Sequence, residues 1–281
     1  MKEDRFISVT VNEGGFEYDI HSLVKAFYPE CEVKVTIGEE AAESSGEGLP
    51  DLHIQFEDQA VLLSLLGGEG NTASFGAKKI EISPDMPRPE VKNRLKQLIY
   101  TALSEYTGKK LPWGTLTGIR PTKIPMTLLE QGTSKGEILH YMQEHYFVST
   151  EKGELAIEIA DREKKLLDTL HYEGGYSLYI GIPFCPTTCL YCSFTSYPIF
   201  SWKKRMGEYL DALEKEIDFV AERYKARVLD TIYIGGGTPT TLEAEELTRI
   251  LNKLRKSFDL SHLKELTVES GRADSITYEK L

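Results

Sequence analysis

The stretch YSLYIGIPFCPTTCLYC, residues 176–192, determines most of what this sequence predicts. Its apolar and aromatic residues alternate over 176–182, which predicts a β-strand. Three cysteines follow the strand, Cys185, Cys189 and Cys192, with the spacing C-x3-C-x2-C. Cysteine thiolates are the usual protein ligands of iron–sulfur clusters, so this loop can bind three irons of a four-iron, four-sulfur cluster. The remaining iron is then open to a substrate or a cofactor.

Two other interpretations of these cysteines are less favoured. A structural zinc site normally has four ligands, and no second C-x2-C pair or H-x3-5-H pattern follows. A zinc-stabilised interaction domain is kept as an alternative. Disulfides are typical of short secreted chains, and the N-terminus MKEDRF is charged with no apolar segment behind it. Cys31 alternates with Val33, Val35 and Ile37, and we interpret it as a small buried hydrophobic residue.

Strands and helices alternate regularly on both sides of the cysteines. After the strand 176–182, the pattern predicts a helix around 209–220, a strand over 228–234, a helix over 244–258 and a strand over 265–268, with another helix beginning at 275–276. Strands joined by helical crossovers form a parallel sheet, and its active-site loops follow the carboxyl ends of the strands. We therefore expect the cysteine loop to lie beside the loop after residue 234.

That second loop is a glycine run, Gly235, Gly236 and Gly237, followed by Thr238. Successive glycines let another molecule approach the backbone closely, where amides and carbonyls can hydrogen-bond a polar ligand such as an amino acid moiety. The G-x-G-x-x-G and Walker A patterns are both absent from the sequence, which disfavours a nucleotide phosphate site.

The first part of the chain has a different texture. Its predicted elements are a strand over 6–11, a helix over 19–28, a strand over 31–37, a hairpin of 52–56 and 61–66, a strand over 78–83 and a helix over 91–103 closed by Gly108. The segment 39–48 is interpreted as an exposed acidic loop. This order predicts a small α+β domain over residues 1–110.

Residues 111–173 are expected to form a loop and a helical spacer. The Gly- and Pro-rich run 111–123 contains Arg120 and Lys123, which could bind a carboxylate or phosphate or simply belong to a solvated connection. Two helices are predicted, over 134–145 and 150–170. His140 and His145 are five residues apart and are interpreted as surface or structural residues.

Composition limits the classes of partner. The net charge of -11 and the pI near 5.2 disfavour nucleic acid and anionic lipid, both of which attract basic surfaces. No apolar run approaches the roughly 18 residues of a spanning helix. We expect a soluble, cytoplasmic protein without a nucleic-acid or membrane partner.

The motifs resemble a known superfamily. The cysteine spacing with Tyr191 before the third cysteine, and the Gly-Gly-Gly-Thr-Pro run, resemble the radical S-adenosylmethionine superfamily. The string Tyr179-x-x-Ile-Pro-Phe-Cys resembles its oxygen-independent coproporphyrinogen III oxidase (coproporphyrinogen dehydrogenase) family. The long N-terminal extension and Thr117-Gly-Ile-Arg-Pro-Thr-Lys are similar to its HemZ-like branch. The expected fold is α/β: the small α+β domain, then, over 174–281, the N-terminal part of a radical SAM barrel with parallel strands.

The resemblance implies a role for each matching residue. Cys185, Cys189 and Cys192 would ligate a [4Fe-4S] cluster whose open iron chelates S-adenosyl-L-methionine, the source of a 5'-deoxyadenosyl radical. The implied cofactor-binding residues are Tyr191, Gly235, Gly236, Gly237, Thr238 and Glu269, and the implied catalytic residue is Tyr179. From the residues alone, Glu269 could equally be a strand-end surface charge and Tyr179 a packed core residue.

The implied activity is the oxidative decarboxylation of coproporphyrinogen III to protoporphyrinogen IX in haem biosynthesis, with flavodoxin or ferredoxin as reductant. Gly181 stands where many relatives have a histidine, so no imidazole is available there. A haem-binding chaperone of the same family, without decarboxylase activity, is the alternative. Because a closed barrel needs about 200 residues or more, the sequence is also expected to be a truncated part of a longer protein.

Overall fold

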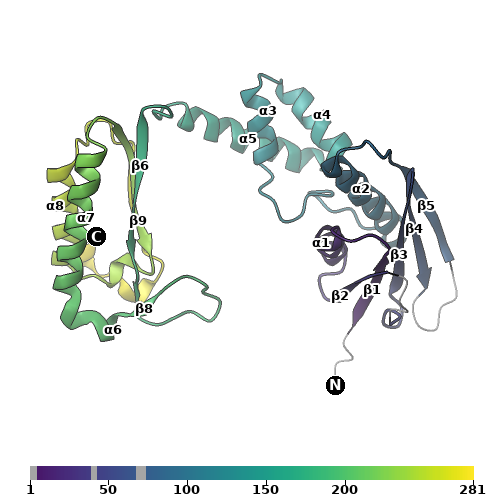
Figure 1. Cartoon of the computed structure of the whole chain (residues 1–281), viewed down its shortest axis with the longest axis horizontal. Helices are drawn as coiled ribbons and strands as arrows, with labels where there is room; N and C mark the ends of the chain where they lie inside the picture. The colour runs from purple at the N-terminus through teal and green to yellow at the C-terminus, as the bar shows by residue number, and fades with distance from the viewer. Residues whose placement is uncertain (1–4, 39–42, 68–73) are drawn as a thin grey trace. The chain divides into compact units, whose positions relative to one another are not determined.

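The structure is a computed structural model that describes residues 5–38, 43–67 and 74–281. The chain folds into two compact units, residues 1–164 and 165–281 (Figure 1). The three-part division predicted from the texture of the sequence stays a prediction.

The first unit contains a five-stranded mixed sheet with the strand order β2-β1-β3-β4-β5. Its strands are β1 (Phe6–Val11), β2 (Glu32–Ile37), β3 (Pro50–Glu57), β4 (Ala60–Gly67) and β5 (Ser74–Glu81). β1 is parallel to both of its neighbours, whereas β3, β4 and β5 are antiparallel. The predicted first strand and the predicted hairpin are confirmed. The acidic loop predicted over 39–48 lies outside the described residues at 39–42.

Two helices, α1 (Glu17–Phe27) and α2 (Arg88–Thr107), cover one face of this sheet (Figure 1). Alternate apolar residues of the strands face these helices because successive strand side chains point to opposite faces. α2 ends where predicted, at Gly108, which has the left-handed φ of 69°. Cys31 is buried, as expected, and its thiol forms no disulfide. Ile37 was predicted to face the same way but is 49% exposed, because it ends a strand at the sheet edge.

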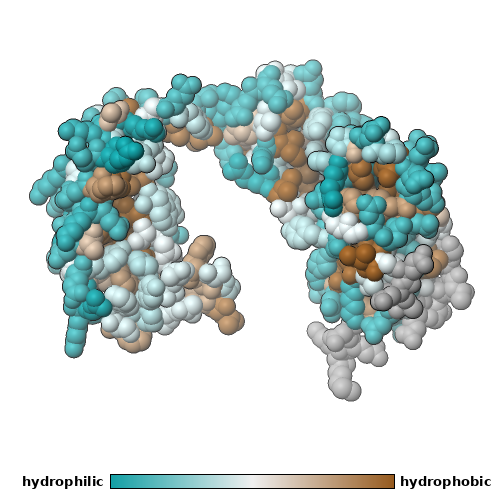
Figure 2. Space-filling model, in the orientation of Figure 1, coloured by the Kyte–Doolittle hydropathy of each residue, from teal (hydrophilic) through white to brown (hydrophobic). Residues whose placement is uncertain are grey.

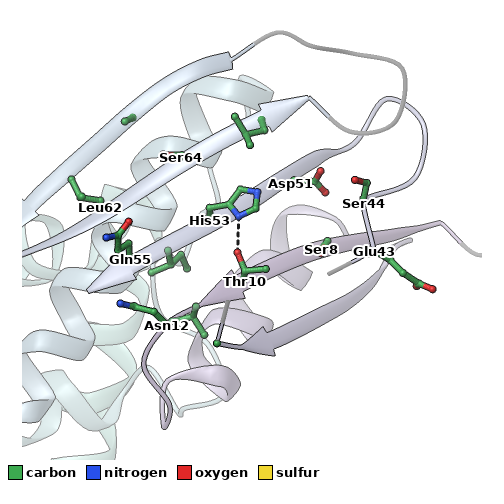
Figure 3. Close-up of a pocket in the computed structure, with 15 residues that line it drawn as sticks. Ser8, Thr10, Asn12, Glu43, Ser44, Asp51, His53, Gln55, Leu62 and Ser64 are labelled. Carbon is green, nitrogen blue, oxygen red and sulfur yellow. Dashed lines mark hydrogen bonds between the residues drawn. The ribbon is translucent and has the colours of Figure 1, made fainter. Parts of the chain in front are cut away.

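The uncovered face of the sheet is polar and forms a shallow groove of about 570 Å³ (Figure 3). Thr10 on β1 and His53 on β3 face each other, with 2.7 Å between Oγ1 and Nδ1. Asn12 and the backbone of Phe56 exchange two hydrogen bonds of 2.7 and 3.0 Å. Thr10, His53 and Asn12 on this face therefore use polar groups in bonds within the unit.

Three helices follow the sheet domain: α3 (Lys123–Glu130), α4 (Lys135–Tyr146) and α5 (Thr150–Leu167), the last of which continues into the second unit. α4 begins after a capping box between Ser134 and Glu137. α3 was not predicted. The preceding run 111–122 is more than a connection, because its backbone is hydrogen-bonded to the end of α4. Thr115 N donates to Tyr146 O at 2.8 Å. Arg120 and Lys123 are exposed, and His140 is exposed on α4.

The second unit is built on three parallel strands in the order β10-β9-β6. These are β6 (Gly175–Ile182), β9 (Val228–Gly236) and β10 (Glu265–Val268). Helices α7 (Met206–Arg223) and α8 (Ala244–Ser257) pack on one face of the sheet (Figure 1). The predicted alternation of strand and helix, and the parallel sheet, are confirmed. Of two short strands, β7 (Phe184–Cys185) contains the first cysteine and β8 (Tyr197–Pro198) follows the third.

The helix predicted to begin at 275–276 is wrong. Residues Ala273–Ser275 and Tyr278–Lys280 form two short 3-10 turns instead. The hydroxyl of Ser275 donates to the carbonyl of Arg272 at 2.7 Å, and Thr240 Oγ1 lies 2.6 Å from Ser275 Oγ. Such side-chain bonds compete with a helical backbone ladder, which accounts for the turn.

None of the helices in the described part of the chain combines the length and the apolarity needed to span a bilayer.

Candidate functional site

The cysteine loop, residues 185–196, lies against the glycine run at the carboxyl ends of β6 and β9. Gly237 N donates to Ile182 O, and Thr238 N donates to Phe184 O, both at 2.8 Å. The Sγ atom of Cys185 lies 3.5 Å from Thr238 Oγ1. The expectation that the two loops meet is therefore confirmed, and it follows from the parallel sheet, which places the ends of neighbouring strands at one edge.

The glycines are required by how closely the two loops approach. Gly236 has a φ of +114°, which residues with a side chain rarely adopt. A β-carbon on Gly236 would lie 2.9 Å from Ile182 N and O. On Gly237 it would lie 2.7 Å from Phe184 O and 2.9 Å from Cys185 Sγ. Any larger residue at these two positions would push the cysteine loop away from the end of β9.

Three side chains from neighbouring strands gather over Gly235. A β-carbon there would lie 2.6 Å from the ring of Tyr233, and 3.0 Å from both the Tyr179 hydroxyl and a Glu269 carboxylate oxygen. The rings of Tyr179 and Tyr233 are stacked, with centroids 5.7 Å apart. Glu269 is fixed at the end of β10 because its N–H donates to Ile234 O at 2.9 Å. Tyr179 and Glu269, both singled out from the sequence, are therefore brought together with the glycine run.

The three thiols differ in environment. Cys185 is buried, and Cys189 and Cys192 are partly exposed. Tyr191, next to the third cysteine, is 90% exposed. Exposed apolar side chains gather on this loop, among them Leu190 and Phe194 (Figure 2). The loop therefore has little packing of its own.

The thiols do not converge in this structure. Within the described residues, no three His, Cys, Asp or Glu side chains are arranged to hold a metal ion. Metal binding is coupled to folding, so ligands on one exposed loop can close around a metal without being preformed. The chemistry of the donor set, three thiols on one short loop, fits an iron–sulfur cluster with three protein ligands. The side-chain-free cradle of the glycine run beside it leaves room for a ligand at the backbone.

Two residues near this site were not predicted from the sequence to belong to it. Tyr233 stacks on Tyr179, and Arg272, four residues after the end of β10, reaches the cysteine loop. Its Nη1 donates to Thr187 Oγ1 at 2.8 Å and lies 4.0 Å from Cys189 Sγ. The alternation of β9 does place Tyr233 on the same face as Gly235, which was an available signal. No periodic pattern joins Arg272 to residues more than 80 positions earlier.

Position 181 is notable for what it lacks. Gly181 is exposed, and a β-carbon there would only make ordinary contact, 3.6 Å from the ring of Tyr179. Its carbonyl accepts a 2.8 Å hydrogen bond from the hydroxyl of Tyr209. Burial, with a smaller effect of Glu216, raises the pKa of Tyr209 to about 12, so this hydroxyl stays protonated at neutral pH. Packing thus leaves room for a β-carbon at 181.

Comparison with known proteins assigns the class. The family model described as the Radical SAM superfamily matches residues 179–274. The second unit therefore contains a radical SAM domain.

The chain is also similar to curated proteins whose names refer to coproporphyrinogen oxidation and to a heme chaperone. It is 37% identical over 273 residues to the oxygen-independent coproporphyrinogen-III oxidase-like protein HemZ of Bacillus subtilis. This match covers 93% of this chain and 52% of HemZ. It is 40% identical over 106 residues to the heme chaperone HemW of the same organism, covering 37% of this chain and 27% of HemW. The chain thus spans about half the length of HemZ.

A solved structure, the coproporphyrinogen III oxidase HemN of Escherichia coli, titled a radical SAM enzyme, is 31% identical to this chain. The match covers 38% of this chain and 25% of HemN, with a TM-score of 0.31.

Proposed function

We propose that this chain is part of a radical SAM oxidoreductase that decarboxylates coproporphyrinogen III to protoporphyrinogen IX in haem biosynthesis. The observation that carries the proposal is the contact between the cysteine loop and the glycine run, at the carboxyl edge of a parallel sheet inside a radical SAM domain. Cys185, Cys189 and Cys192 would hold a [4Fe-4S] cluster. When bound, the cluster and S-adenosyl-L-methionine supply one-electron chemistry that abstracts hydrogen from a substrate.

The glycine run is suited to an ammonium group. The N–H groups of Gly237 and Thr238 already donate to Ile182 and Phe184, so these two amides are not free to bind an anion. Carbonyl and carboxylate oxygens accept hydrogen bonds from an ammonium group. Glu269 adds a carboxylate beside Gly235. We infer that these groups bind the amino end of S-adenosyl-L-methionine, with Tyr191 of the exposed loop near its adenine.

The stacked pair Tyr179 and Tyr233 forms one wall beside this site. Tyr179 is 61% exposed on the sheet face that the helices leave uncovered, so its hydroxyl is accessible to a ligand. The pairing fixes the ring of Tyr179 over Gly235, where it can orient groups near the cluster. Tyr179 is our candidate for a catalytic residue.

The proposed partners follow from the same function. The substrate is a tetrapyrrole, the reductant is a small electron-transfer protein such as flavodoxin or ferredoxin, and the location is the cytoplasm. We propose no nucleic-acid or membrane partner, because the net charge of -11 gives no attraction for a polyanion or an anionic membrane.

The test is an anaerobic turnover assay of the full-length protein. Reconstituted protein, S-adenosyl-L-methionine, reductant and coproporphyrinogen III are expected to form protoporphyrinogen IX, measured by chromatography of the oxidised porphyrins. Cys189→Ala is expected to abolish product formation. A protein that binds the cluster and cleaves the cofactor, yet never consumes coproporphyrinogen III, would contradict the decarboxylase proposal.

A second candidate function is a haem-binding chaperone. Two observations favour it: relatives named heme chaperone match about a third of the chain, and Gly181 offers no imidazole beside Tyr179. The same assay separates the two functions, because a chaperone is expected to bind haem stably without forming protoporphyrinogen. Gly181→His, whose β-carbon would make only an ordinary contact with the ring of Tyr179, provides a further measurement: a gain of decarboxylation would indicate that the missing imidazole limits the reaction.

A further inference from the structure

Arg272 lies in the segment after β10, and its guanidinium group points in two directions. Nε and Nη2 bind both carboxylate oxygens of Asp274, at 2.9 and 2.6 Å. Nη1 is directed at the cysteine loop, where it donates to Thr187 Oγ1 at 2.8 Å and lies 4.0 Å from Cys189 Sγ. A planar guanidinium can make both sets of contacts at once, and a lysine ammonium cannot.

The backbone that carries Arg272 is itself fixed to the segment after the glycine run. The Arg272 carbonyl accepts from the Ser275 hydroxyl, which lies 2.6 Å from Thr240 Oγ1 in a buried pair. Lys280 Nζ donates to the carbonyls of Thr240 and Ser275 at 2.9 and 3.2 Å. The Arg272 side chain is only 25% exposed. The group that contacts the cysteine loop is therefore attached to a rigid support.

The cysteine loop has few other restraints. Residues 186–196 contain a turn bond from Cys192 N to Cys189 O and a contact between Thr188 and Ser196. Among the described side chains from outside the loop, Arg272 is the one that hydrogen-bonds these residues. Because the exposed apolar side chains of this loop provide little packing, its position depends strongly on this arginine.

We propose that Arg272 is a positioning residue for the cluster: it holds the Thr187–Cys189 part of the loop beside the glycine run and places a fixed positive charge next to the sulfur of Cys189. The inference rests on the proposed function, in that Cys189 is taken as a cluster ligand. A cation near an iron–sulfur cluster favours the more negatively charged, reduced state, because net charge around the cluster helps to set its potential. Arg272 is expected to raise the cluster potential and to reduce the mobility of the ligand loop.

The first experiment uses the full chain without a cluster. In Arg272→Gln, amide hydrogen exchange over residues 186–192 is expected to accelerate about tenfold. A hydrogen bond from a charged group shifts the equilibrium between the closed and open states of the loop by a factor on the order of ten. Thr187→Val, which removes one acceptor and keeps the shape, is expected to give a smaller acceleration in the same direction. Unchanged exchange over 186–192 in both variants would overturn the positioning role.

Arg205→Gln is the matched control. Arg205 also makes a two-nitrogen ion pair, at 3.1 and 3.0 Å to Glu208, but that pair lies at the start of α7. Its loss is expected to leave exchange over 186–192 unchanged. Acceleration in the control equal to that in Arg272→Gln would show that any lost ion pair loosens the unit, and would overturn the specific role of Arg272.

The second experiment measures the midpoint potential of the reconstituted cluster. Arg272→Gln is expected to shift the midpoint potential to a more negative value. Arg272→Lys keeps the charge, so its potential is expected to lie close to that of the parent, although its loop exchanges as fast as in Arg272→Gln. A potential equal to that of the parent in Arg272→Gln would overturn the electrostatic role. If the parent chain bound no cluster at all, the proposed function would fail, while the exchange result in the cluster-free chain would stand by itself.

Discussion

The two sheets of this protein use their uncovered faces in opposite ways. In the first unit, polar side chains on that face bond to one another and to the backbone, as Thr10 does with His53 and Asn12 with Phe56. In the second unit, the carboxyl end of the sheet carries glycines with no room for a side chain and a loop whose thiols are partly exposed. The first arrangement uses Thr10, His53 and Asn12 in bonds within the fold, and the second leaves groups available for a ligand.

Residues that stabilise the fold and residues that can bind a ligand thus lie in different places. Satisfied polar groups stabilise a fold but offer nothing to bind, whereas exposed thiols and a bare backbone cost packing that a bound group can restore. Within the second unit the same division holds between the two ends of β9. Its carboxyl end faces the cysteines, and its amino end holds the buried Asp230 against His171.

The largest expected effect is at the cysteines and would sharpen this comparison. Cys185→Ala should abolish cluster binding and lower cofactor cleavage at least about a hundredfold, because three-ligand clusters have no spare protein ligand. Cys31→Ala, a buried cysteine in the first unit, should leave both unchanged. Iron and sulfide analysis with a cleavage assay checks this. Equal iron content in the two variants would break the contrast between the units.

The next effect is at the glycines. In Gly237→Ala the new β-carbon meets Phe184 O and Cys185 Sγ, so we expect a loss of about 2 kcal/mol in the stability of the second unit, together with weaker cluster binding. Gly207→Ala, in α7 with nothing within 4 Å, should change stability by about 1 kcal/mol or less. Denaturant unfolding followed by hydrogen exchange locates each effect.

A parallel change in the first unit tests whether the effects stay separate. A β-carbon on Gly114, which has a φ of +56°, would overlap the carbonyl of Tyr146. Gly114→Ala is therefore expected to loosen the helical part of the first unit and to leave cluster binding intact. Loss of the cluster in this variant would contradict the assignment of the site to the second unit.

Asp230 gives a smaller, pH-dependent effect. Burial alone would raise the pKa of its carboxyl, but hydrogen bonds from the backbone and ring of His171 outweigh it, and the pKa lies below its usual range. A carboxyl whose pKa is lowered on folding stabilises the protein above its unfolded pKa of about 3.9, and this contribution is lost as the pH falls through the lower folded value.

Asp230→Asn should therefore cost about 2 kcal/mol at neutral pH and flatten the loss of stability in acid below about pH 4. Cluster binding should be unaffected, because Asp230 lies near the amino end of β9. Urea unfolding from pH 3 to pH 7 checks both expectations. A variant as acid-sensitive as the parent would refute the role given to the His171 bonds.

The smallest effect is at Arg249, which joins α8 to α7 through Asp211 and Glu214 at 2.6 and 2.7 Å. Arg249→Ala is expected to destabilise the second unit by about 0.5–1 kcal/mol, and by less at high salt, because partly exposed ion pairs are screened. Denaturant midpoints at low and high salt provide the measurement, with Arg205→Ala as a control within one helix end. A loss independent of salt would indicate packing instead of charge.

The sequence predicted what local patterns encode. Hydrophobic alternation gave the strands around Tyr179 and Tyr233, and the parallel order of these strands placed Cys185 beside Gly237. Both rest on periodicity and on general rules of strand connection. The class of the second unit followed from the cysteine and glycine motifs, which the family comparison confirms.

Other features could not be read from such patterns. The helix α3 was missed because Pro125 and the short span of eight residues hide its period. The turns after β10 replace a helix because Ser275 bonds to Arg272 and Thr240, a non-local arrangement. The contact of Arg272 with Cys189 joins residues 83 positions apart, and only the fold brings them together.

The central claim is that three cysteines hold a [4Fe-4S] cluster with one iron open to S-adenosyl-L-methionine. The most direct measurement is electron paramagnetic resonance of the anaerobically reconstituted and reduced chain, with and without that cofactor, alongside iron and sulfide analysis. The account predicts about four irons and four sulfides per chain and a signal that changes when the cofactor is added. Zinc in place of iron, or a cluster signal that the cofactor leaves unaltered, would contradict it.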